Sequence, residues 1–246
     1  MQSVGAPFER PPSKPRLDRP GQADHYTSGF VDCPTTAPFF VSIATMDFLI
    51  AFSLIAFGVY SLKSADQKRR IALLGSHLGQ YEIEKLMAHL TDGYLRALGE
   101  ADSARRAQIW QLLGTTEAAL CEQFNRFVLA FSKVDAAQTR VSRLALALPH
   151  ADKLFPQATF DLRKVLSIHA QGLTQAAQNS ANRSPKDKAY TLSAELFLMQ
   201  HTCHWFCRSR AVASARVLAR HQTSHSQLLQ AVAPATREAY LAITQG

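Results

Sequence analysis

Apolar residues along this chain form one continuous block near the N-terminus and, after it, a long region with helical spacing. The block runs from Phe39 to Leu62, and Asp47 is its only charged residue. At about 1.5 Å per residue, a helix over this block would be about 36 Å long, more than the roughly 30 Å of a bilayer's hydrocarbon core. The block therefore predicts a transmembrane helix over residues 39–62.

Two alternatives to a transmembrane helix are a buried core helix and a cleaved signal peptide. Core helices seldom have so long an uncharged stretch. A signal peptide carries its positive charge before the apolar run and a small-residue cleavage site after it. Here the order is reversed, which favours a retained anchor. The basic residues that follow the block at once are Lys63, Lys68, Arg69 and Arg70.

The same basic residues predict the orientation of the anchor. The segment that precedes the block offers only Arg19 against Asp24 and Asp32 in its last twenty residues. Lys and Arg accumulate on the cytoplasmic side of membrane spans. We therefore expect a single-pass protein of the plasma (inner) membrane with its C-terminal domain in the cytoplasm. The four basic residues after the block would contact anionic lipid headgroups, each worth about 1 kcal/mol near the surface.

Residues 1–38 lack any apolar period and are rich in Pro, Gly and polar residues. Such composition predicts a disordered leader. Translation could instead start at Met46, in which case the leader is not native and Asp47 is a terminal residue. With the longer start, Asp47 lies near the outer end of the span, where water or headgroups reach it. A solvated carboxylate is then favoured over a functional intramembrane one.

Residues 63–246 form the predicted cytoplasmic domain, in which apolar residues recur at helical spacing almost to the C-terminus. The first helix could continue directly from the anchor, and the aromatic end of the second is the expected centre of the core. Since no stretch of alternating apolar residues is bounded by turn signals, we predict no β-sheet. The predicted helices cover residues 71–99, 103–133, 135–148, 156–180 and 185–233.

The last of these helices has a clear start signal. Ser184, Pro185 and Asp187 take its N-cap, N1 and N3 positions, a capping box with Asp in place of Glu. No Gly or Pro occurs between Pro185 and Pro234, so one helix of about 70 Å is predicted. The fold class is thus all-α: a single transmembrane helix followed by a cytoplasmic bundle, or a coiled-coil-like hairpin, of long antiparallel helices.

The densest group of metal-capable side chains is Cys203, His204 and Cys207, followed by His221 and His225. On a helix, each pair four or three residues apart could chelate a soft or borderline ion. In an unbroken helix the Cys and His pairs would lie about 20 Å apart, so one ion could join them only if the helix bends. Cys203 also falls on the apolar stripe, where free cysteine acts as a small hydrophobe. We therefore predict packing and no cofactor, with metal or haem binding in a redox or sensor protein as the alternative.

Other chemistry has little support in the sequence. The chain has no Gly-rich phosphate loop, GxSxG, HExxH or acidic metal-loop signature, so an enzyme is less expected than a binding protein and no catalytic residue is predicted. Four cysteines are too few for a disulfide framework and suit a reducing compartment.

Net charge adds one further expectation. The chain carries +8, and residues 63–246 hold 23 basic against 14 acidic side chains. Nucleic-acid binding is not expected, because few aromatic residues accompany the arginines near the C-terminus. Those arginines would meet headgroups only if their helix folds back toward the bilayer. We expect a membrane-anchored helical interaction or scaffold protein whose partners are the membrane and an unidentified protein or a second copy. The arginines are Arg208, Arg210, Arg216 and Arg220.

Overall fold

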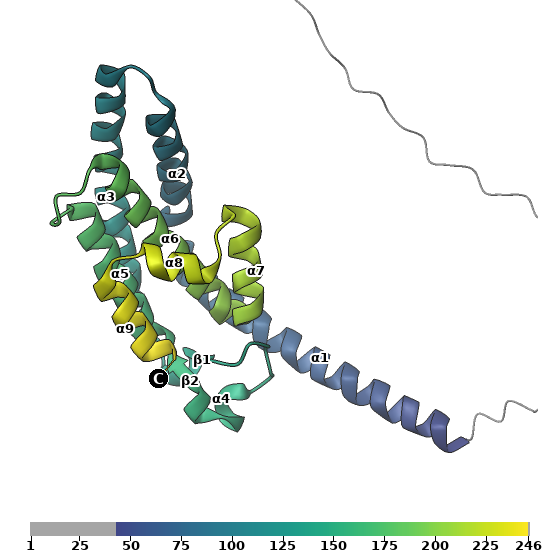
Figure 1. Ribbon diagram of the computed structural model, residues 1–246. Coiled ribbons are helices and arrows are strands. Elements are labelled where there is room, and N and C mark those ends of the chain that lie inside the picture. Colours follow the sequence, from purple (N-terminus) through teal and green to yellow (C-terminus); the bar gives the residue numbers. More distant parts are fainter. Residues whose placement is uncertain (1–42, 246) are drawn as a thin grey trace, which may run out of the picture.

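The computed structural model describes residues 43–245, and in that range the chain is almost wholly α-helical (Figure 1). The predicted leader, including Cys33, and Phe39 lie outside the described residues. The α-helices are α1 (Ile43–Leu78), α2 (Ile83–Gly99), α3 (Ser103–Phe131), α4 (Ala151–Leu154), α5 (Leu162–Gln178), α6 (Pro185–Cys207), α7 (Arg210–His221), α8 (His225–Ala231) and α9 (Pro234–Thr244). Two short 3-10 turns, η1 (Ala136–Gln138) and η2 (Pro156–Ala158), precede the strands β1 (Arg140–Ser142) and β2 (Thr159–Asp161).

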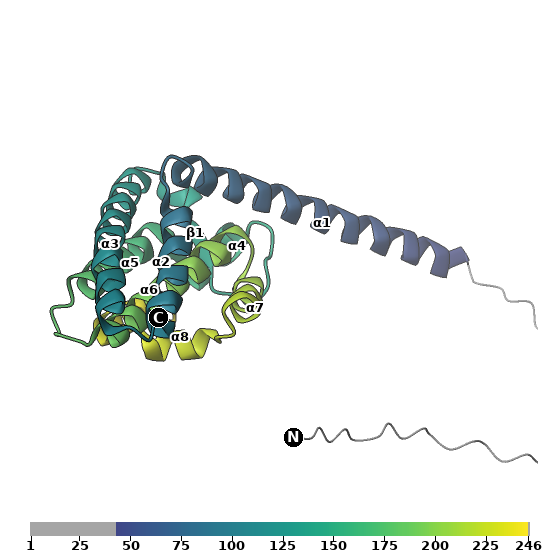
Figure 2. The same cartoon turned by 90° about the horizontal axis from the view of Figure 1, so that it is seen from above.

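Helix α1 has two halves with different surroundings. From Met46 to Leu62 its side chains are exposed, apart from the half-buried Gly58. Beyond Lys63 the helix packs onto α3 and α6, and Leu74 is buried. Figures 1 and 2 show the first half projecting from the bundle. The apolar block is therefore not a core helix: it is long and apolar enough to cross a membrane, and none of that window is buried in the bundle.

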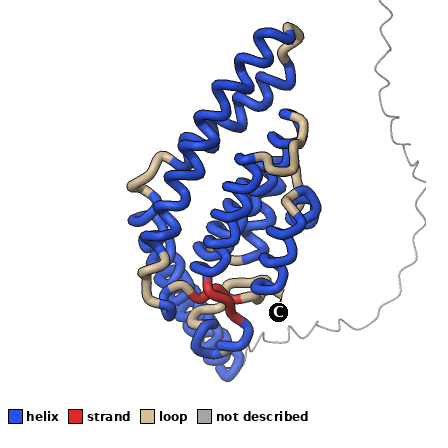
Figure 3. The backbone as a smooth tube through the Cα atoms, turned by 90° about the vertical axis from the view of Figure 1, so that its left-hand side faces the viewer, coloured by secondary structure: helices blue, strands red, loops and turns tan. Residues whose placement is uncertain are grey.

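The bundle is organised around α5 and α6. Helices α2 and α3 form an antiparallel hairpin, α3 packs on α5, and α5 packs on α6. Helices α7 and α8 cover α6, while α9 covers α5. This arrangement confirms the all-α fold class, with a long apolar helix followed by a helical bundle (Figure 3).

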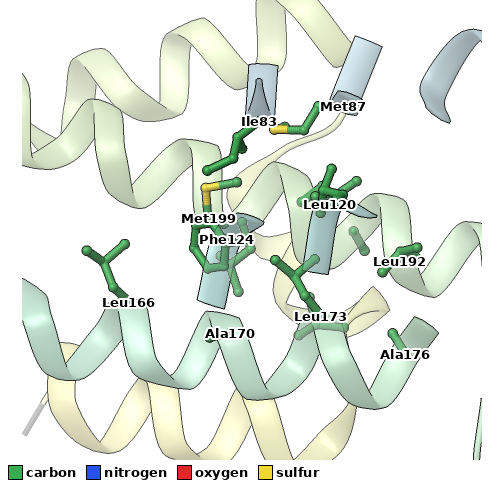
Figure 4. Close-up of a cluster of buried hydrophobic side chains, with 14 of the residues drawn as sticks. Ile83, Met87, Leu120, Phe124, Leu166, Ala170, Leu173, Ala176, Leu192 and Met199 are labelled. Atoms are coloured by element: carbon green, nitrogen blue, oxygen red, sulfur yellow. The ribbon is translucent and has the colours of Figure 1, made fainter. Parts of the chain in front are cut away.

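The aromatic end of α3 lies at the centre of the core, as expected. Phe124, Phe127 and Phe131 are fully buried, with successive ring centroids 5.7 Å apart. Figure 4 shows Phe124 facing Leu166 and Leu173 of α5 and side chains of α2 and α6. Tilted aromatic pairs at this spacing add to the free energy gained by burying their area.

The predicted absence of a β-sheet is wrong. Strands β1 and β2 pair antiparallel, with Val141 opposite Phe160, and form a small sheet at one end of the bundle (Figure 3). Asp135 caps only the short turn η1 instead of a helix over 135–148, and Asp161 is the N-cap of α5. Strands of three residues are too short to leave an alternating pattern, so the sequence carried no period-2 signal.

The predicted helix over 71–99 is divided in two. Helix α1 ends at Leu78 and α2 begins at Ile83, which is buried. The backbone N–H of Glu82 donates to the side-chain oxygen of Gln123 on α3, at 2.7 Å. This hydrogen bond to α3 takes the place of a helical one at the break between α1 and α2.

The predicted helix over 185–233 is confirmed at its start and wrong beyond Cys207. Ser184 caps α6 by accepting from the backbone N–H of Asp187 at 3.1 Å. The chain then leaves helical geometry at Arg208 and enters the left-handed region at Gln222. Ser209 and Ser224 cap the new helices α7 and α8. Serine side chains that capture free N–H groups compete with helix continuation, even without Gly or Pro.

Replacing a core phenylalanine tests the position of the core. The substitution Phe127→Ala should lower the free energy of unfolding by about 3–5 kcal/mol, because it leaves a cavity among packed rings. Leu129→Ala, two residues along the same helix, removes a side chain that is 67% exposed and should cost well under 1 kcal/mol. Urea unfolding of the full chain in mild detergent, followed by circular dichroism, measures both. Equal effects would contradict this placement of the core.

Candidate functional site

The break after α6 brings basic side chains beside α1. At Arg208 the chain turns beside α1, and the Arg208 guanidinium donates to Oε1 of Gln67 at 2.6 Å. A hollow of about 360 Å³ lies here, between α1 and the start of α7. The chain thus folds back so that Arg208 and Arg216 lie beside α1 where its exposed apolar half ends. The hollow, called here the basic hollow, is lined by Tyr60, Lys63, Ser64, Gln67, Arg208, Val212 and Arg216.

An apolar pocket of about 290 Å³ adjoins the basic hollow, between α1, α2 and α6. Figure 4 shows Ile83, Met87 and Met199 pointing toward one another beside the core. The two cavities share Arg208 and Arg216 in their walls. The other side chains around the apolar pocket include Ile71, Leu74, Leu78, Glu84, Gln200, Cys203, His204 and Cys207.

The junction of these cavities is positively charged. Arg216 lines both of them and also a third hollow beside His204 and Arg220. Among the residues that the structure describes, Lys63, Arg208, Arg216 and Arg220 form no salt bridge with a carboxylate. Glu84, on the apolar pocket, is the only acidic residue that lines the three cavities. The junction is thus suited to an anion.

The residues predicted to meet lipid headgroups have different surroundings. Lys63 lines the basic hollow, and Lys68 and Arg69 are exposed on α1. Asp47 is exposed on the projecting half of α1. Arg70 is engaged within the bundle, as described next.

Arg70 attaches α1 to the bundle. It forms a salt bridge with Asp66 at 2.9 Å and donates to the backbone carbonyl of Arg140 at 2.9 Å. Its guanidinium also lies over the ring of Phe206, 5.4 Å from the centroid. With these partners Arg70 is not free for a headgroup, and it instead fixes the direction in which α1 leaves the bundle.

The metal candidates are divided between two places. Cys203, His204 and Cys207 line the apolar pocket. His221 stacks on Phe197, with ring centroids 3.7 Å apart, and His225 lies elsewhere against α6. Within the part of the chain that the structure describes, no three His, Cys, Asp or Glu side chains are grouped closely enough to hold a metal ion.

The two thiols in the pocket wall are neutral. Burial raises the pKa of Cys203 to about 12 and that of Cys207 to about 11. A metal binds the thiolate, so a raised pKa opposes metal binding. Burial, with the charges of Arg216 and Arg220, lowers the pKa of His204. Cys203, His204 and Cys207 thus form part of the pocket surface.

A buried histidine cluster is the feature that sequence reasoning missed. His225 stacks on His201 with ring centroids 4.1 Å apart, and Nε2 of His201 bonds with the hydroxyl of Ser214 at 3.0 Å. His169 bonds through Nε2 with the hydroxyl of Thr202 at 2.9 Å. The sequence does carry a signal that α6 is buried. Residues 190–206 contain one charged residue, Glu195, as expected of a helix buried on every side, so its histidines would also be buried.

The histidines of this cluster are held neutral. Burial lowers the pKa of His169 to about 3 and that of His225 to about 4. Burial and the neighbouring His225 lower the pKa of His201 to about 2. The cluster is therefore a polar part of the core that resists protonation.

Comparison of the chain with protein families, with curated proteins and with solved structures finds no match. Its function is therefore inferred from the geometry of α1 and of the adjoining cavities.

The buried histidines should make the bundle sensitive to acid. Unfolded histidine takes up a proton near pH 6.5, whereas folded His169 does so near pH 3, so protonation favours the unfolded chain across that interval. Each such histidine should contribute up to about 1.4 kcal/mol of lost stability per pH unit as the pH falls. The substitution His169→Gln should make the free energy of unfolding depend less steeply on pH, because one proton fewer is taken up on unfolding.

Urea unfolding at half-unit steps from pH 7 to pH 4 measures this slope. The matched control is His89→Gln, on an exposed residue of α2. This variant should keep the slope of the unsubstituted chain. The account of the cluster fails if His169→Gln also keeps it.

Proposed function

We propose that this chain is a single-pass protein of the plasma (inner) membrane, and that its helical domain is held at the cytoplasmic face to bind a partner there. The observation that carries the proposal is the exposed apolar half of α1. Between Met46 and Leu62 the large apolar side chains are 46–76% exposed. Removing them from water would be worth on the order of 20 kcal/mol in total, above the 5–15 kcal/mol that stabilises a typical domain. A bilayer supplies the missing apolar environment.

The helix joins the apolar half to the bundle without a break. Helix α1 is continuous from Ile43 to Leu78, so about 24 Å of rigid helix lies between Leu62 and its end. Arg70, held by Asp66 one turn earlier on the same helix, joins this segment to the bundle through the backbone carbonyl of Arg140 and the ring of Phe206. A continuous helix sets both the distance and the orientation of the domain relative to the bilayer, which supports a role as a positioned interaction domain.

The bundle also presents apolar groups near the end of the anchor. The segment that follows β1 lies against α1 between Lys63 and Arg70, where the two line a small cavity together. In this segment Leu146 is 69% exposed and Leu148 is 44% exposed. With Lys63 at the same level, this surface combines cationic and apolar groups as membrane-interface segments do.

A second exposed surface supports binding to a protein partner or a second copy. At the other end of the bundle, a hollow of about 470 Å³ between α2, α6 and α8 is lined by Leu95, Leu98 and Tyr190. All three side chains are exposed. Contiguous exposed apolar side chains on a folded domain are typical of interaction surfaces.

A fluorescent reporter fused after Gly246 tests anchoring and orientation together. The reporter should fluoresce at the cell edge, since green fluorescent protein matures in the cytoplasm, and an alkaline phosphatase fusion at the same place should be inactive. The double substitution Phe52→Arg with Ile55→Arg should abolish the rim of fluorescence, because each arginine at a span centre costs about 2.5–3.5 kcal/mol. Leu112→Arg with Leu129→Arg, at exposed positions of α3, is the control that should keep the rim. Diffuse fluorescence of the unsubstituted chain, or an active phosphatase, would contradict the proposal.

A further inference from the structure

The apolar pocket is a groove of about 290 Å³ between α1, α2 and α6, open to the surface on one side. Most of its wall is apolar, with Ile71, Leu74 and Leu78 on α1 facing Ile83 on α2. That volume is at the lower end of the range for small-molecule sites. Met87 and Met199 contribute to its wall, and their flexible thioethers can adapt to a chain of variable shape. The interior of the pocket thus suits a thin apolar group.

The mouth of the pocket suits an anion. Arg208 and Arg216 stand where the apolar pocket meets the basic hollow, and neither is neutralised by a salt bridge in the described part of the chain. Gln67 orients Arg208 through the 2.6 Å hydrogen bond, and Arg216 lies 3.4 Å from Nδ1 of His204. Guanidinium groups bind carboxylates and phosphates through paired N–H donors. Glu84 is a single opposing charge on the pocket wall.

The position of the two cavities along α1 connects them to the bilayer. The basic hollow follows α1 from Tyr60 to Gln67, so it begins within the last turn of the apolar block. The apolar pocket follows the same helix from Ile71 to Leu78. Headgroups occupy the several ångströms outside the hydrocarbon core, which is the level of Lys63 when Leu62 ends the span. A lipid-derived molecule can therefore reach the hollow directly from the leaflet.

From these observations we propose that the groove formed by the basic hollow and the apolar pocket binds a single-chain anionic amphiphile, either a fatty carboxylate or a monoacyl phosphate. Its acyl chain lies in the pocket between α1, α2 and α6, and its anionic head lies against Arg208 and Arg216. The proposal rests on the proposed membrane anchoring, since the ligand enters from the adjoining leaflet.

The test uses the full chain in phosphatidylcholine nanodiscs, with a photoactivatable fatty acid that carries a diazirine near its methyl end. After illumination, mass spectrometry maps the labelled peptides. Label on residues 46–62 reports insertion of the span, and label on residues 83–87 and 199–207 reports occupancy of the pocket outside the bilayer. We expect both, and an excess of oleate should remove the second while oleyl alcohol and inorganic phosphate should not.

Two variants test the two parts of the groove. A Cβ placed at Gly75, which lines the pocket, meets no atom within 4 Å, so Gly75→Leu should fold normally and fill the pocket. Arg208→Gln with Arg216→Gln removes the charge at the mouth. Each variant should reduce pocket labelling about tenfold or more while leaving span labelling unchanged. The control Arg96→Gln with Arg105→Gln, on α2 and α3, should label like the unsubstituted chain.

Each alternative outcome overturns the proposal in a recognisable way. Absence of label from residues 46–62 would show that the chain does not insert, and the proposed anchoring would fall with the ligand. Span label without pocket label, or pocket label that both variants preserve, would overturn the amphiphile site alone. Competition by oleyl alcohol would show that the head is not recognised, and competition by inorganic phosphate would show a site for free anions.

Discussion

The exposure of the apolar side chains on the projecting half of α1 is the constraint on which the proposed function depends. The first half of α1 projects away from the bundle (Figure 2). None of its apolar window is therefore buried by the other described elements. The second half of the same helix is part of the packed domain, with Leu74 in the core. Because α1 is one continuous helix, the direction of its apolar half determines how the helical domain is placed relative to that half.

Several features of the bundle follow from that rigid connection. Arg70 joins α1 to β1 through the carbonyl of Arg140 and to α6 through the ring of Phe206, while Asp66 on α1 itself orients its guanidinium. The turn at Arg208 then places Arg208 and Arg216 where α1 leaves the bundle, and neither forms a salt bridge with a carboxylate among residues 43–245. The charge and the pocket lie together because α1 forms one wall of both cavities, so the end of its exposed apolar half, the basic hollow and the apolar pocket follow one another along the helix.

Much of the fold could be predicted from apolar spacing, and the failures have specific causes. The long apolar helix, the start of α3 at Ser103 and the Ser184 cap all depend on local patterns that a sequence displays. The breaks at Arg208 and Gln222 depend on competition between side-chain caps and helical hydrogen bonds, and no Gly or Pro marks them. The strand pair depends on contacts between residues distant in the sequence, such as Val141 and Phe160, which are nineteen positions apart. A single helix continuing beyond Cys207 would place the distal arginines far from α1. The groove that Arg208 and Arg216 form with α1 could therefore not be predicted from the sequence.

The most direct test of the account is fractionation of the full-length chain from broken cells without detergent. The account predicts that the chain sediments with membranes in the ultracentrifuge and stays in the pellet after an alkaline carbonate wash, because its attachment is by apolar burial and not by charge. Recovery of the folded chain in the first supernatant would show that α1 finds its apolar partner elsewhere. The anchor, its orientation and the lipid-facing groove would then all be wrong.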